Sequence, residues 1–444
     1  MSNELGSPVS SADRISSLDV IRGAALLGIL LMNVVGFGLP YAYDNPHNSG
    51  GADGLNFLTW QITSLFFEGT MRGLFSILFG AGIVLMTSRA EARDPNIAVA
   101  DIYFRRNLWL IAFGLVHAWL LLFPGDILYR YGVVALFLFV FRKVSPKILI
   151  VLGLLVLAST TMKDIYWNFE ENNAQAAAIS AQTLLDSGEE ISEEQQDAID
   201  DWQEKLDDHE VTAEAIDEMV TAKQGGYFEN IANNAERIIQ GQSYGLYMYT
   251  FADAAGMMLI GMALLKLGIL NAERSNRFYL TMMAVGYGVG LSANVHEMNL
   301  LIAGNFGYVA VGQSFLTFEL GRVPITLGHV GLVMLICRNG WLRWLTSRLA
   351  AVGQMALTNY ISHSIVCAIV FLGIGFSMFG ELQRYQLYYV VFAIWIFQLI
   401  ISPIWLRHFR FGPLEWLWRS LTYREKQPMR RTAQSAQTAQ TAKP

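Results

Sequence analysis

Residues 18–39 have the sequence LDVIRGAALLGILLMNVVGFGL, an apolar run of the length that a membrane-crossing helix needs. Such a helix must supply about 20 mostly apolar residues to cross the roughly 30 Å hydrocarbon core of a bilayer. Nine further runs qualify, at 71–88, 104–123, 127–141, 146–163, 246–266, 278–301, 314–337, 353–377 and 386–406. The sequence therefore predicts an all-α fold, a polytopic membrane helix bundle of about ten transmembrane helices.

The composition supports the same class of protein. Hydrophobic residues make up 53% of the 444 residues and charged residues only 15%, against roughly a quarter in soluble domains. This balance excludes an ordinary soluble enzyme and a disordered chain. The formal net charge of −6 excludes a nucleic-acid partner, because nucleic acids are bound by basic surfaces. Two cysteines exclude a disulfide scaffold.

The basic residues predict the orientation of the chain, because loops on the cytoplasmic side of a membrane retain lysine and arginine. When the N-terminus is placed inside, most of the 31 Lys and Arg residues fall in predicted cytoplasmic segments. The sequence thus predicts an even number of spans with both termini in the cytoplasm.

One hydrophilic segment, residues 164–243, interrupts the apolar pattern and carries more than half of the 37 acidic residues. Its Ala, Glu, Gln and Leu content predicts an acidic helical extracytoplasmic insert, either a solvated cap or a lid over an outward-facing site. The rest of the chain then divides into an N-terminal five-helix half, a C-terminal five-helix half that ends in an amphipathic helix, and a disordered tail, at 1–163, 244–424 and 425–444.

Charged residues in the predicted spans point to function, because a charge at mid-membrane costs about 2.5–3.5 kcal/mol on insertion scales. Near the inner edge, Asp19 and Arg22 share a helix face, since they lie three positions apart. Arg105 and Arg106 begin the third span on the same side, and Arg14 precedes the first. Together they could bind an anion such as a phosphate. The alternative is that the arginines only set topology.

The middle of the membrane holds three histidines on different predicted spans, His117, His329 and His363. Asn359 accompanies His363, and Asn33 lies in the outer half of the first span. Each histidine alone would more often be a packed, hydrogen-bonded side chain, but three at similar depth suggest a shared polar interior. The sequence lacks the ligand spacings of metal sites, so we expect no metal.

Opposite charges lie near the outer edge at helical spacing. Glu68 precedes Arg72 by four residues, Glu319 precedes Arg322 by three, and Asp126 lies in the hairpin after the third span. Structural ion pairing is the plain interpretation of such pairs. Polar groups at the inner edge, the middle and the outer edge nevertheless predict a polar column through the bundle.

Several motifs carry a family resemblance. They are SLDVIRG at 17–23, MRGLFSILFGAG at 71–82, GLVH at 114–117, PGDIL at 124–128, GRVPIT at 321–326, GQMALTNY at 353–360 and FGPLEWLWR at 411–419. In combination they resemble the YeiB-like family of bacterial inner-membrane proteins, domain of unknown function 418, over most of the chain. The resemblance implies a multi-pass protein of the bacterial cell inner membrane, and it indicates architecture more than activity.

A wider resemblance concerns residues 14–23. Their pattern, R-x-x-S-L-D-x-x-R-G, is similar to the opening of transmembrane acyltransferases of the heparan-glucosaminide acetyltransferase group. That group takes acyl groups from cytoplasmic acyl-CoA and acylates a sugar on the other side of the membrane. Its implied active site is an Asn late in the first span and a His in the next outer loop. Here Asn33 matches the first and His47 is available for the second, with His117 as the replacement.

These residues could support acyl transfer, which needs a base, a group that orients the base, and donors for the developing oxyanion. His117 or His47 could be the base, Asp126 the orienting group and Asn33 the donor, while the inner arginines bind the phosphates of acyl-CoA. The acceptor would be an extracytoplasmic hydroxyl or amine on a glycan or lipid-linked molecule. A transporter of a small solute and a lipid-binding scaffold are the alternatives. The expected partners are the lipid bilayer, the acceptor and, as an open question, a second copy of the chain.

Overall fold

The structure is a computed structural model that describes residues 16–43, 45–93 and 99–431. Most of these residues are helical, and the β-type pairing found among them is one isolated bridge between Phe409 and Arg430. The all-α prediction is thus confirmed. Arg14 and the end of the predicted tail lie outside the described residues.

The helices of the first half and of the insert are α1 (Ser16–Gly38), α2 (Gly54–Phe66), α3 (Thr70–Arg93), α4 (Val99–Trp119), α5 (Leu128–Leu138), α6 (Pro146–Asp186), α7 (Glu193–His209), α8 (Ala213–Gln224) and α9 (Tyr227–Gln242). The second half contains α10 (Phe251–Lys266), α11 (Asn276–Ala303), α12 (Tyr308–Ser314), α13 (Phe318–Asn339), α14 (Arg343–Gln354), α15 (Ala356–Phe371), α16 (Arg384–His408) and α17 (Pro413–Tyr423). Short 3₁₀ and π turns, Phe139–Lys143 and Leu246–Thr250, follow α5 and precede α10.

Seven helical stretches in the described part are long and apolar enough to cross a membrane, and an eighth arises if α14 and α15, which meet at an angle of 83°, count as one span. The predicted number of ten spans is therefore not confirmed. The predicted spans 104–123 and 127–141 correspond to α4 and α5, which lie outside this set. α5 has only 11 residues, or about 16 Å.

The outer faces of the long helices are apolar. Leu154 and Leu155 of α6 are 51% and 62% exposed, and Phe397 of α16 is 61% exposed. Exposed apolar faces of this extent favour lipid rather than water as the surroundings. The protein is a polytopic membrane protein; that the membrane is the inner one and both termini are cytoplasmic stay predictions.

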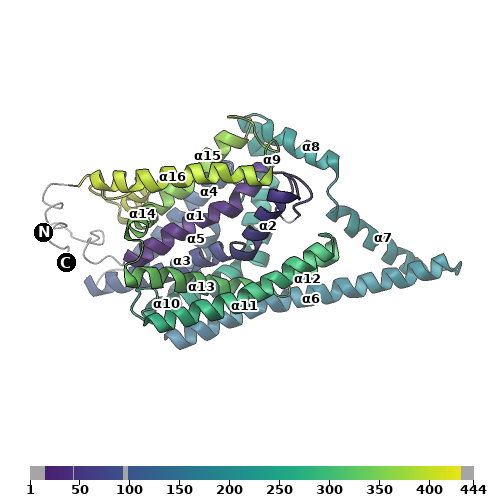
Figure 1. Cartoon of the computed structure of the whole chain (residues 1–444), viewed down its shortest axis with the longest axis horizontal. Helices are drawn as coiled ribbons and strands as arrows, with labels where there is room; N and C mark the ends of the chain where they lie inside the picture. Colours follow the sequence, from purple (N-terminus) through teal and green to yellow (C-terminus); the bar gives the residue numbers. More distant parts are fainter. Residues whose placement is uncertain (1–15, 44, 94–98, 432–444) are drawn as a thin grey trace.

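The centre of the bundle is α1, which is buried along most of its length and packs against α3, α14, α15 and α16. The packing of α1 on α14 is very close, because a Cβ added to Gly23 would overlap the carbonyl oxygen of Leu349. Small residues at such crossings let two backbones approach. Figure 1 shows α1 inside the bundle, with α16 along one side and α6 along the other.

The two ends of the bundle differ. We call the end with Ser16 of α1 and His408 of α16 the terminal end, and the end with Gly38 and Arg384 the insert end (Figure 1). α17 belongs to the terminal end, where the Glu415 carboxylate accepts hydrogen bonds from the backbone N–H groups of Leu357 and Thr358 at the start of α15.

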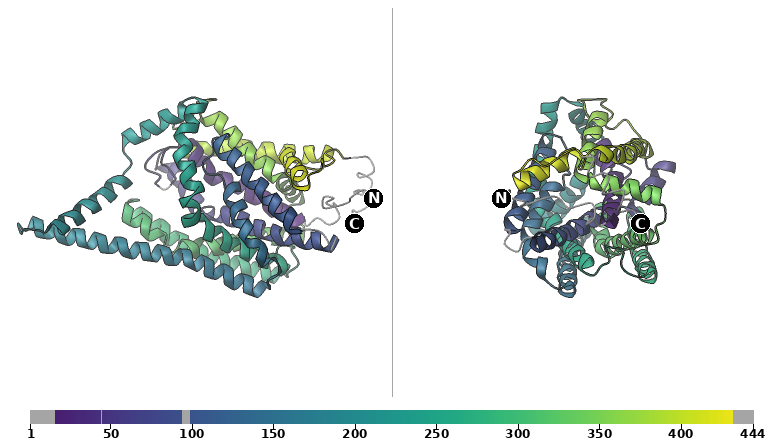
Figure 2. Two further views of the ribbon diagram at one scale, coloured as in Figure 1. Left: turned by 180° about the vertical axis from the view of Figure 1, so that it is seen from behind. Right: turned by 90° about the vertical axis from the view of Figure 1, so that its left-hand side faces the viewer.

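The insert projects from the bundle. α6 has 41 residues, about 60 Å, which is twice the thickness of the hydrocarbon core. The predicted boundary at residue 163 therefore lies inside one continuous helix. Figure 2 shows α6 extending beyond the bundle and α7 returning toward α8 and α9. Lys205 of α7 pairs with Glu171 of α6 at 2.8 Å.

Candidate functional site

A chain of three polar side chains lies buried between α4, α15 and the hairpin that joins α4 to α5. The Nδ1 atom of His117 is 2.7 Å from Oδ1 of Asp126, and its Nε2 atom is 2.7 Å from Oγ of Ser364. A carboxylate only accepts hydrogen bonds, so Nδ1–H donates to Asp126; in the neutral imidazole Nε2 then accepts from the Ser364 hydroxyl. The exposed fractions of the three residues are 0%, 3% and 1%. We call these residues the His117 chain.

The local sequence explains why Asp126 meets His117. The Pro124-Gly125 turn reverses the chain between α4 and α5, and Gly114 lets the hairpin fold back onto α4. A Cβ at Gly114 would overlap the backbone nitrogen of Tyr129. The second carboxylate oxygen of Asp126 accepts from the Tyr129 N–H at 2.8 Å, as a side chain at a helix start does. The Asp126 carboxylate thus accepts hydrogen bonds both from the first turn of α5 and from the imidazole of His117.

Two aromatic rings enclose the imidazole of His117. The ring centroid of Phe123 is 5.3 Å away, and that of Tyr360 is 5.1 Å away in an edge-on arrangement. Phe123 also stacks on Phe37 at the end of α1. Tyr360 lies four residues before Ser364 on α15, and its hydroxyl accepts from the Ile127 N–H at 3.4 Å. The imidazole is therefore enclosed by aromatic rings on the sides that Asp126 and Ser364 do not occupy.

His363 and Asn359 are buried on α15 in a second network toward α16. The Nε2–H group of His363 donates to Oε1 of Gln398 at 3.0 Å, and the Gln398 amide donates to the Asn359 carbonyl at 3.0 Å. The Asn359 amide donates to Ser402 of α16 and, across the bend between α14 and α15, to the carbonyl of Val352. This network binds α15 to α16 and supports the bend.

The outer arginines meet in a third cluster, which we call the Arg322 cluster. Nη1 of Arg322 is 2.6 Å from Oδ1 of Asp253, and Nε of Arg72 is 3.1 Å from Oδ2 of the same carboxylate. Arg322 also pairs with Glu319, and it is 1% exposed. Glu68 directly precedes Gly69, which lies against the Arg322 side chain. The ion pairs favour the plain interpretation, a structural lock between α3, α10 and α13.

Three other predicted residues stay apart from the His117 chain in the described structure. His329 donates from Nε2 to the Phe66 carbonyl at 2.9 Å and accepts from the Tyr287 hydroxyl at 2.9 Å, so both ring nitrogens are used in packing. His47 is exposed in the loop after α1 and contacts the ring of Phe306. Asn33 is half-buried on α1. Among these described residues, neither Asn33 nor His47 shares a hydrogen bond with His117, whose ring nitrogens meet Asp126 and Ser364.

The arginines of the terminal end have different partners. Arg22 pairs with Asp19 at 2.9 Å. Arg105 pairs with Asp101 at 2.7 Å and donates to the Thr422 carbonyl. These contacts hold the terminal ends of α1 and α4.

Arg106 stacks on the C-terminal amphipathic helix. Its guanidinium lies 3.7 Å from the centre of the Trp418 ring, and the Trp418 indole N–H donates to its carbonyl at 2.9 Å. Arg22 and Arg419 both lie close enough to repel its charge. Three guanidinium groups from α1, α4 and α17 therefore gather at the terminal end.

The polar groups thus form separate clusters, and the hydrogen bonds and ion pairs of the described residues do not join them into the continuous column that the sequence suggested. Half-buried Arg130 lies between two of them, because both Asp126 of the His117 chain and Arg72 of the Arg322 cluster act on its charge. In residues 16–43, 45–93 and 99–431, no group of three or more His, Cys, Asp or Glu side chains is placed to hold a metal ion.

Comparison with known proteins identifies relatives of this chain. A family model described as "Protein of unknown function (DUF418)" matches residues 264–425. "Uncharacterized protein YeiB" of Escherichia coli is 29% identical over 434 residues, 94% of this chain and 98% of that protein. The chain is therefore similar to the DUF418 family over residues 264–425 and to YeiB over nearly its whole length. "Uncharacterized protein YxaH" of Bacillus subtilis is 27% identical over 442 residues, 95% of this chain and 97% of the relative. No solved structure matches the chain significantly.

The insert covers the His117 chain from the insert end. The Tyr227 hydroxyl of α9 donates to the Leu120 carbonyl at the end of α4 at 2.8 Å. The Gly373 N–H, just after α15, donates to the Lys223 carbonyl of α8 at 3.0 Å. A small apolar cluster joins the ends of α4 and α15 to two residues of α9; its buried members are Leu122, Ala368 and Leu372. α8 and α9 therefore pack against the ends of α4 and α15, the two helices that contain His117 and Ser364.

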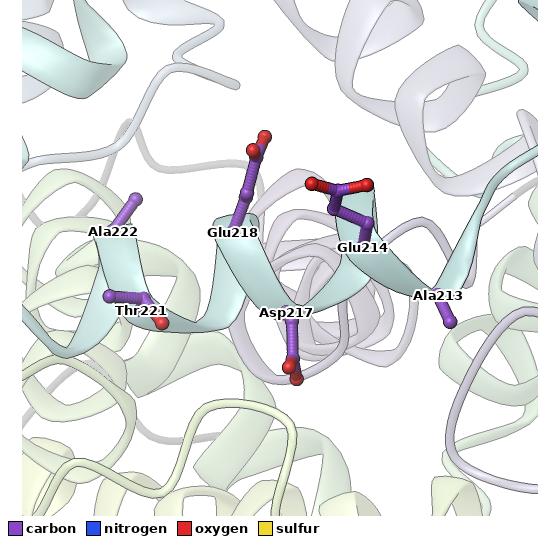
Figure 3. Close-up of a pocket in the computed structure, with 6 residues that line it drawn as sticks. All are labelled: Ala213, Glu214, Asp217, Glu218, Thr221 and Ala222. Carbon is purple, nitrogen blue, oxygen red and sulfur yellow. The ribbon is translucent and has the colours of Figure 1, made fainter.

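The acidic residues of α8 do not converge. A hollow runs along α8, lined by Ala213, Glu214, Asp217, Glu218, Thr221 and Ala222. Figure 3 shows Glu214 and Glu218 pointing to one side of α8 and Asp217 to the other. This spacing is typical of a solvated helix rather than of a ligand site.

Sequence reasoning about this YeiB-like chain missed Ser364, the third member of the His117 chain. It lies 247 positions from His117, and a serine in an apolar run is an ordinary residue with no spacing signal. Its only signal is that it neighbours His363 and lies four residues after Tyr360 on one helix face.

Proposed function

We propose that this protein is a membrane acyltransferase that moves an acyl group from acyl-CoA at the terminal end, the predicted cytoplasmic side, to a hydroxyl or amine acceptor at the insert end. The acceptor would be a glycan or a lipid-linked molecule. The observation that carries the proposal is the His117 chain, in which Asp126 holds Nδ1 of a buried imidazole and Nε2 faces a hydroxyl. A base and its orienting group in this arrangement are what acyl transfer needs.

The hydrogen bond from Nδ1–H to Asp126 holds the imidazole of His117 in one orientation. Because Asp126 accepts from Nδ1–H, the lone pair of Nε2 is free to take a proton from a hydroxyl. When that proton arrives, the imidazolium is stabilised by the carboxylate 2.7 Å away. The charge interaction is strong because the site excludes water and its dielectric is low. His117 can therefore take and return a proton without leaving its position.

The donor side is supported by the arginines of the terminal end. Arg22, Arg106 and Arg419 gather where the phosphates of acyl-CoA would enter, and guanidinium groups bind phosphates well. Arg106 and His117 lie 11 positions apart on α4, about 16 Å along the helix axis. An extended pantetheine arm can cover that distance, so a thioester could reach His117 while its phosphates stay at the arginines.

The acceptor side is supported by Arg130 and the insert. Arg130 lies between Asp126 and Arg72 and is close to Gly241 at the end of α9, where its Nη2 atom would be 2.8 Å from an added Cβ. A half-buried guanidinium there suits an acceptor with an anionic group. Because α8 and α9 cover the ends of α4 and α15, the acceptor would enter when these helices move, as lids do in other enzymes.

The test uses the full-length protein in vesicles of phosphatidylethanolamine and phosphatidylglycerol, which offer an amine and hydroxyls. Acetyl-, octanoyl- and palmitoyl-CoA with a radiolabelled acyl group serve as donors, and free thiol and labelled lipid are measured. We expect His117→Ala to lower thiol release by about 10²- to 10⁴-fold. His47→Ala is the matched control and should retain activity. Absence of both acyl-CoA binding and thiol release would overturn the proposal, and solute counterflow without CoA would favour a transporter.

A further inference from the structure

We propose that Ser364 carries the acyl group as a covalent ester during transfer. This inference rests on the proposed function and adds to it a nucleophile and an order of events. It predicts that the donor reacts with the protein before the acceptor does, so that the two substrates never need to occupy the site together.

The geometry of the His117 chain supports a nucleophilic serine. The Ser364 Oγ atom is 2.7 Å from Nε2 of His117, and the opposite ring nitrogen is held by a buried carboxylate. Serine, histidine and aspartate in this order form the arrangement that activates a hydroxyl in hydrolases of several unrelated folds. Such a chain is recognised by geometry and roles rather than by sequence position.

The hydrogen bond of Ser364 is unusual for a helical serine in this protein. In an apolar helix a hydroxyl usually donates to a carbonyl of the preceding turn. Ser362 donates to the Asn359 carbonyl, Thr87 to that of Ile83 and Ser292 to that of Gly288. Among the hydrogen bonds of the described residues, the Ser364 hydroxyl instead has His117 as its partner. A hydroxyl held by a base rather than by its own helix is available for reaction.

Two groups beside the His117 chain are candidates to stabilise a developing oxyanion. The Tyr360 hydroxyl accepts from the Ile127 N–H, and in the part of the chain that the structure describes its own O–H meets no acceptor. It lies one helical turn before Ser364. Arg130 lies close enough to act on both Tyr360 and Asp126. A phenol O–H and a guanidinium charge in a buried site provide the stabilisation on which acyl transfer depends.

The reaction balances in two half-steps. In the first, Oγ of Ser364 attacks the thioester carbonyl carbon and its proton passes to Nε2 of His117. The carbon–sulfur bond then breaks, and the imidazolium returns the proton to sulfur, which leaves free CoA and an ester on Ser364. In the second, the acceptor hydroxyl or amine attacks the ester carbonyl and gives its proton to His117. The carbon–oxygen bond to Ser364 breaks, and Ser364 recovers the proton.

A covalent intermediate also fits the separation of the two entrances. The arginines that would hold CoA lie at the terminal end, whereas α8 and α9 cover the site at the insert end. With the acyl group on Ser364, CoA can leave at one end before the acceptor enters at the other.

The experiment is to incubate the full-length protein in detergent with acetyl-CoA radiolabelled in the acetyl group and without acceptor, quench it in acid, and map the label by mass spectrometry. We expect stoichiometric label on the peptide that contains Ser364. The label should be absent in Ser364→Ala and retained in Ser362→Ala, whose hydroxyl bonds its own helix. Cys367→Ala should also retain it, which excludes a thioester on the same helix.

A second variant guards against loss of folding. Ser364→Cys places a nucleophile of similar size at the same position, and its label should become sensitive to neutral hydroxylamine, as a thioester is. A Ser364→Ala variant that keeps wild-type transfer would overturn the covalent inference. So would the absence of label at position 364 in both the wild-type protein and the Ser364→Cys variant. In both results His117→Ala would still abolish transfer if the proposed function holds, and retained transfer in His117→Ala would instead contradict the proposed function itself.

Discussion

The His117 chain and the Arg322 cluster are both buried polar groups, yet they differ in what their charges do. In the Arg322 cluster, two guanidinium groups meet the carboxylates of Asp253 and Glu319, and each charge is balanced by another. In the His117 chain, one carboxylate holds an imidazole whose other nitrogen faces a hydroxyl. The first arrangement resists change, while the second allows a proton to move. Burial of polar groups alone therefore does not mark a catalytic site.

The largest effect is expected from Asp126→Asn in the His117 chain. The amide oxygen can still accept from the Tyr129 N–H, so α5 should form, but the imidazole loses its negative partner and its tautomer is no longer defined. We expect kcat for thiol release to fall by about 10⁴-fold with little change in thermal unfolding. If the variant unfolds instead, Asp126 acts mainly as a structural residue, and the His117 chain would not differ from the Arg322 cluster in this respect.

The Arg322 cluster should respond in the opposite way. Arg322→Met leaves the Asp253 carboxylate, which is 4% exposed, without its closest cation. Removing one partner of a buried ion pair costs about 3–5 kcal/mol. We expect a lower free energy of unfolding, measured by denaturant titration in detergent micelles. If the free energy of unfolding were unchanged and acyl transfer were lost, Arg322 would have a role in the reaction rather than in stabilising the fold.

A smaller effect is expected at the terminal end. Arg106→Gln removes one of three gathered guanidinium groups but keeps polar contact with α17. We expect the Kd for acyl-CoA to rise by about 10- to 100-fold, the value of about one charged hydrogen bond, while kcat stays the same. Isothermal titration with non-hydrolysable acyl-CoA would measure the change. The matched control is Lys143→Gln, an exposed basic residue after α5 that pairs with Glu91; equal loss in both variants would argue against a specific donor site.

The smallest effect concerns how the insert seats over the His117 chain. Burial and, to a smaller extent, the charge of Arg237 lower the pKa of Lys223 in α8 from its ordinary value of 10.5 to about 8. Above pH 8 the folded insert loses this proton, whereas the unfolded segment keeps it until about pH 10.5. The unfolded form therefore binds more protons in that window, and the stability of the folded form rises with pH.

Hydrogen exchange of α8, corrected for its intrinsic pH dependence, should accordingly show more protection at about pH 9.5 than at about pH 7. Lys223→Met should abolish this difference. A pH dependence that persists in Lys223→Met would assign the effect to another group of the insert.

The long spans could be predicted from sequence, and the shorter elements could not. A membrane requires each spanning segment to satisfy its own backbone hydrogen bonds, so apolar runs such as 18–39 and 386–406 identify helices directly. The length of an apolar run predicts the helices less well in two places. α5 has only 11 residues, and α14 and α15 meet at an angle of 83°. Their positions depend on contacts with other helices, such as Gly23 against α14 and Asn359 across the bend.

Two of the three residues of the His117 chain could be predicted from the sequence. His117 and Asp126 lie nine positions apart, on either side of a Pro-Gly turn whose geometry brings neighbouring residues together. Asn33 and His47 were chosen by family resemblance, and the structure does not join them to His117. The expected pair of Arg322 with Glu319 is present, and Arg322 and Arg72 both also meet Asp253 of α10, which the spacing of the charges did not predict.

The amino-acid sequence by itself determined that this chain is a bundle of apolar helices with an acidic insert, because lipid and water sort side chains by local composition. It also determined the His117–Asp126 pair, because a short turn constrains its own neighbours. Only the tertiary structure decided that Ser364 is the third residue of the His117 chain and that α8 and α9 cover these three residues. Those contacts join segments more than 100 residues apart. They depend on how the helices pack against each other, and no periodic pattern in the sequence indicates which distant residues will meet.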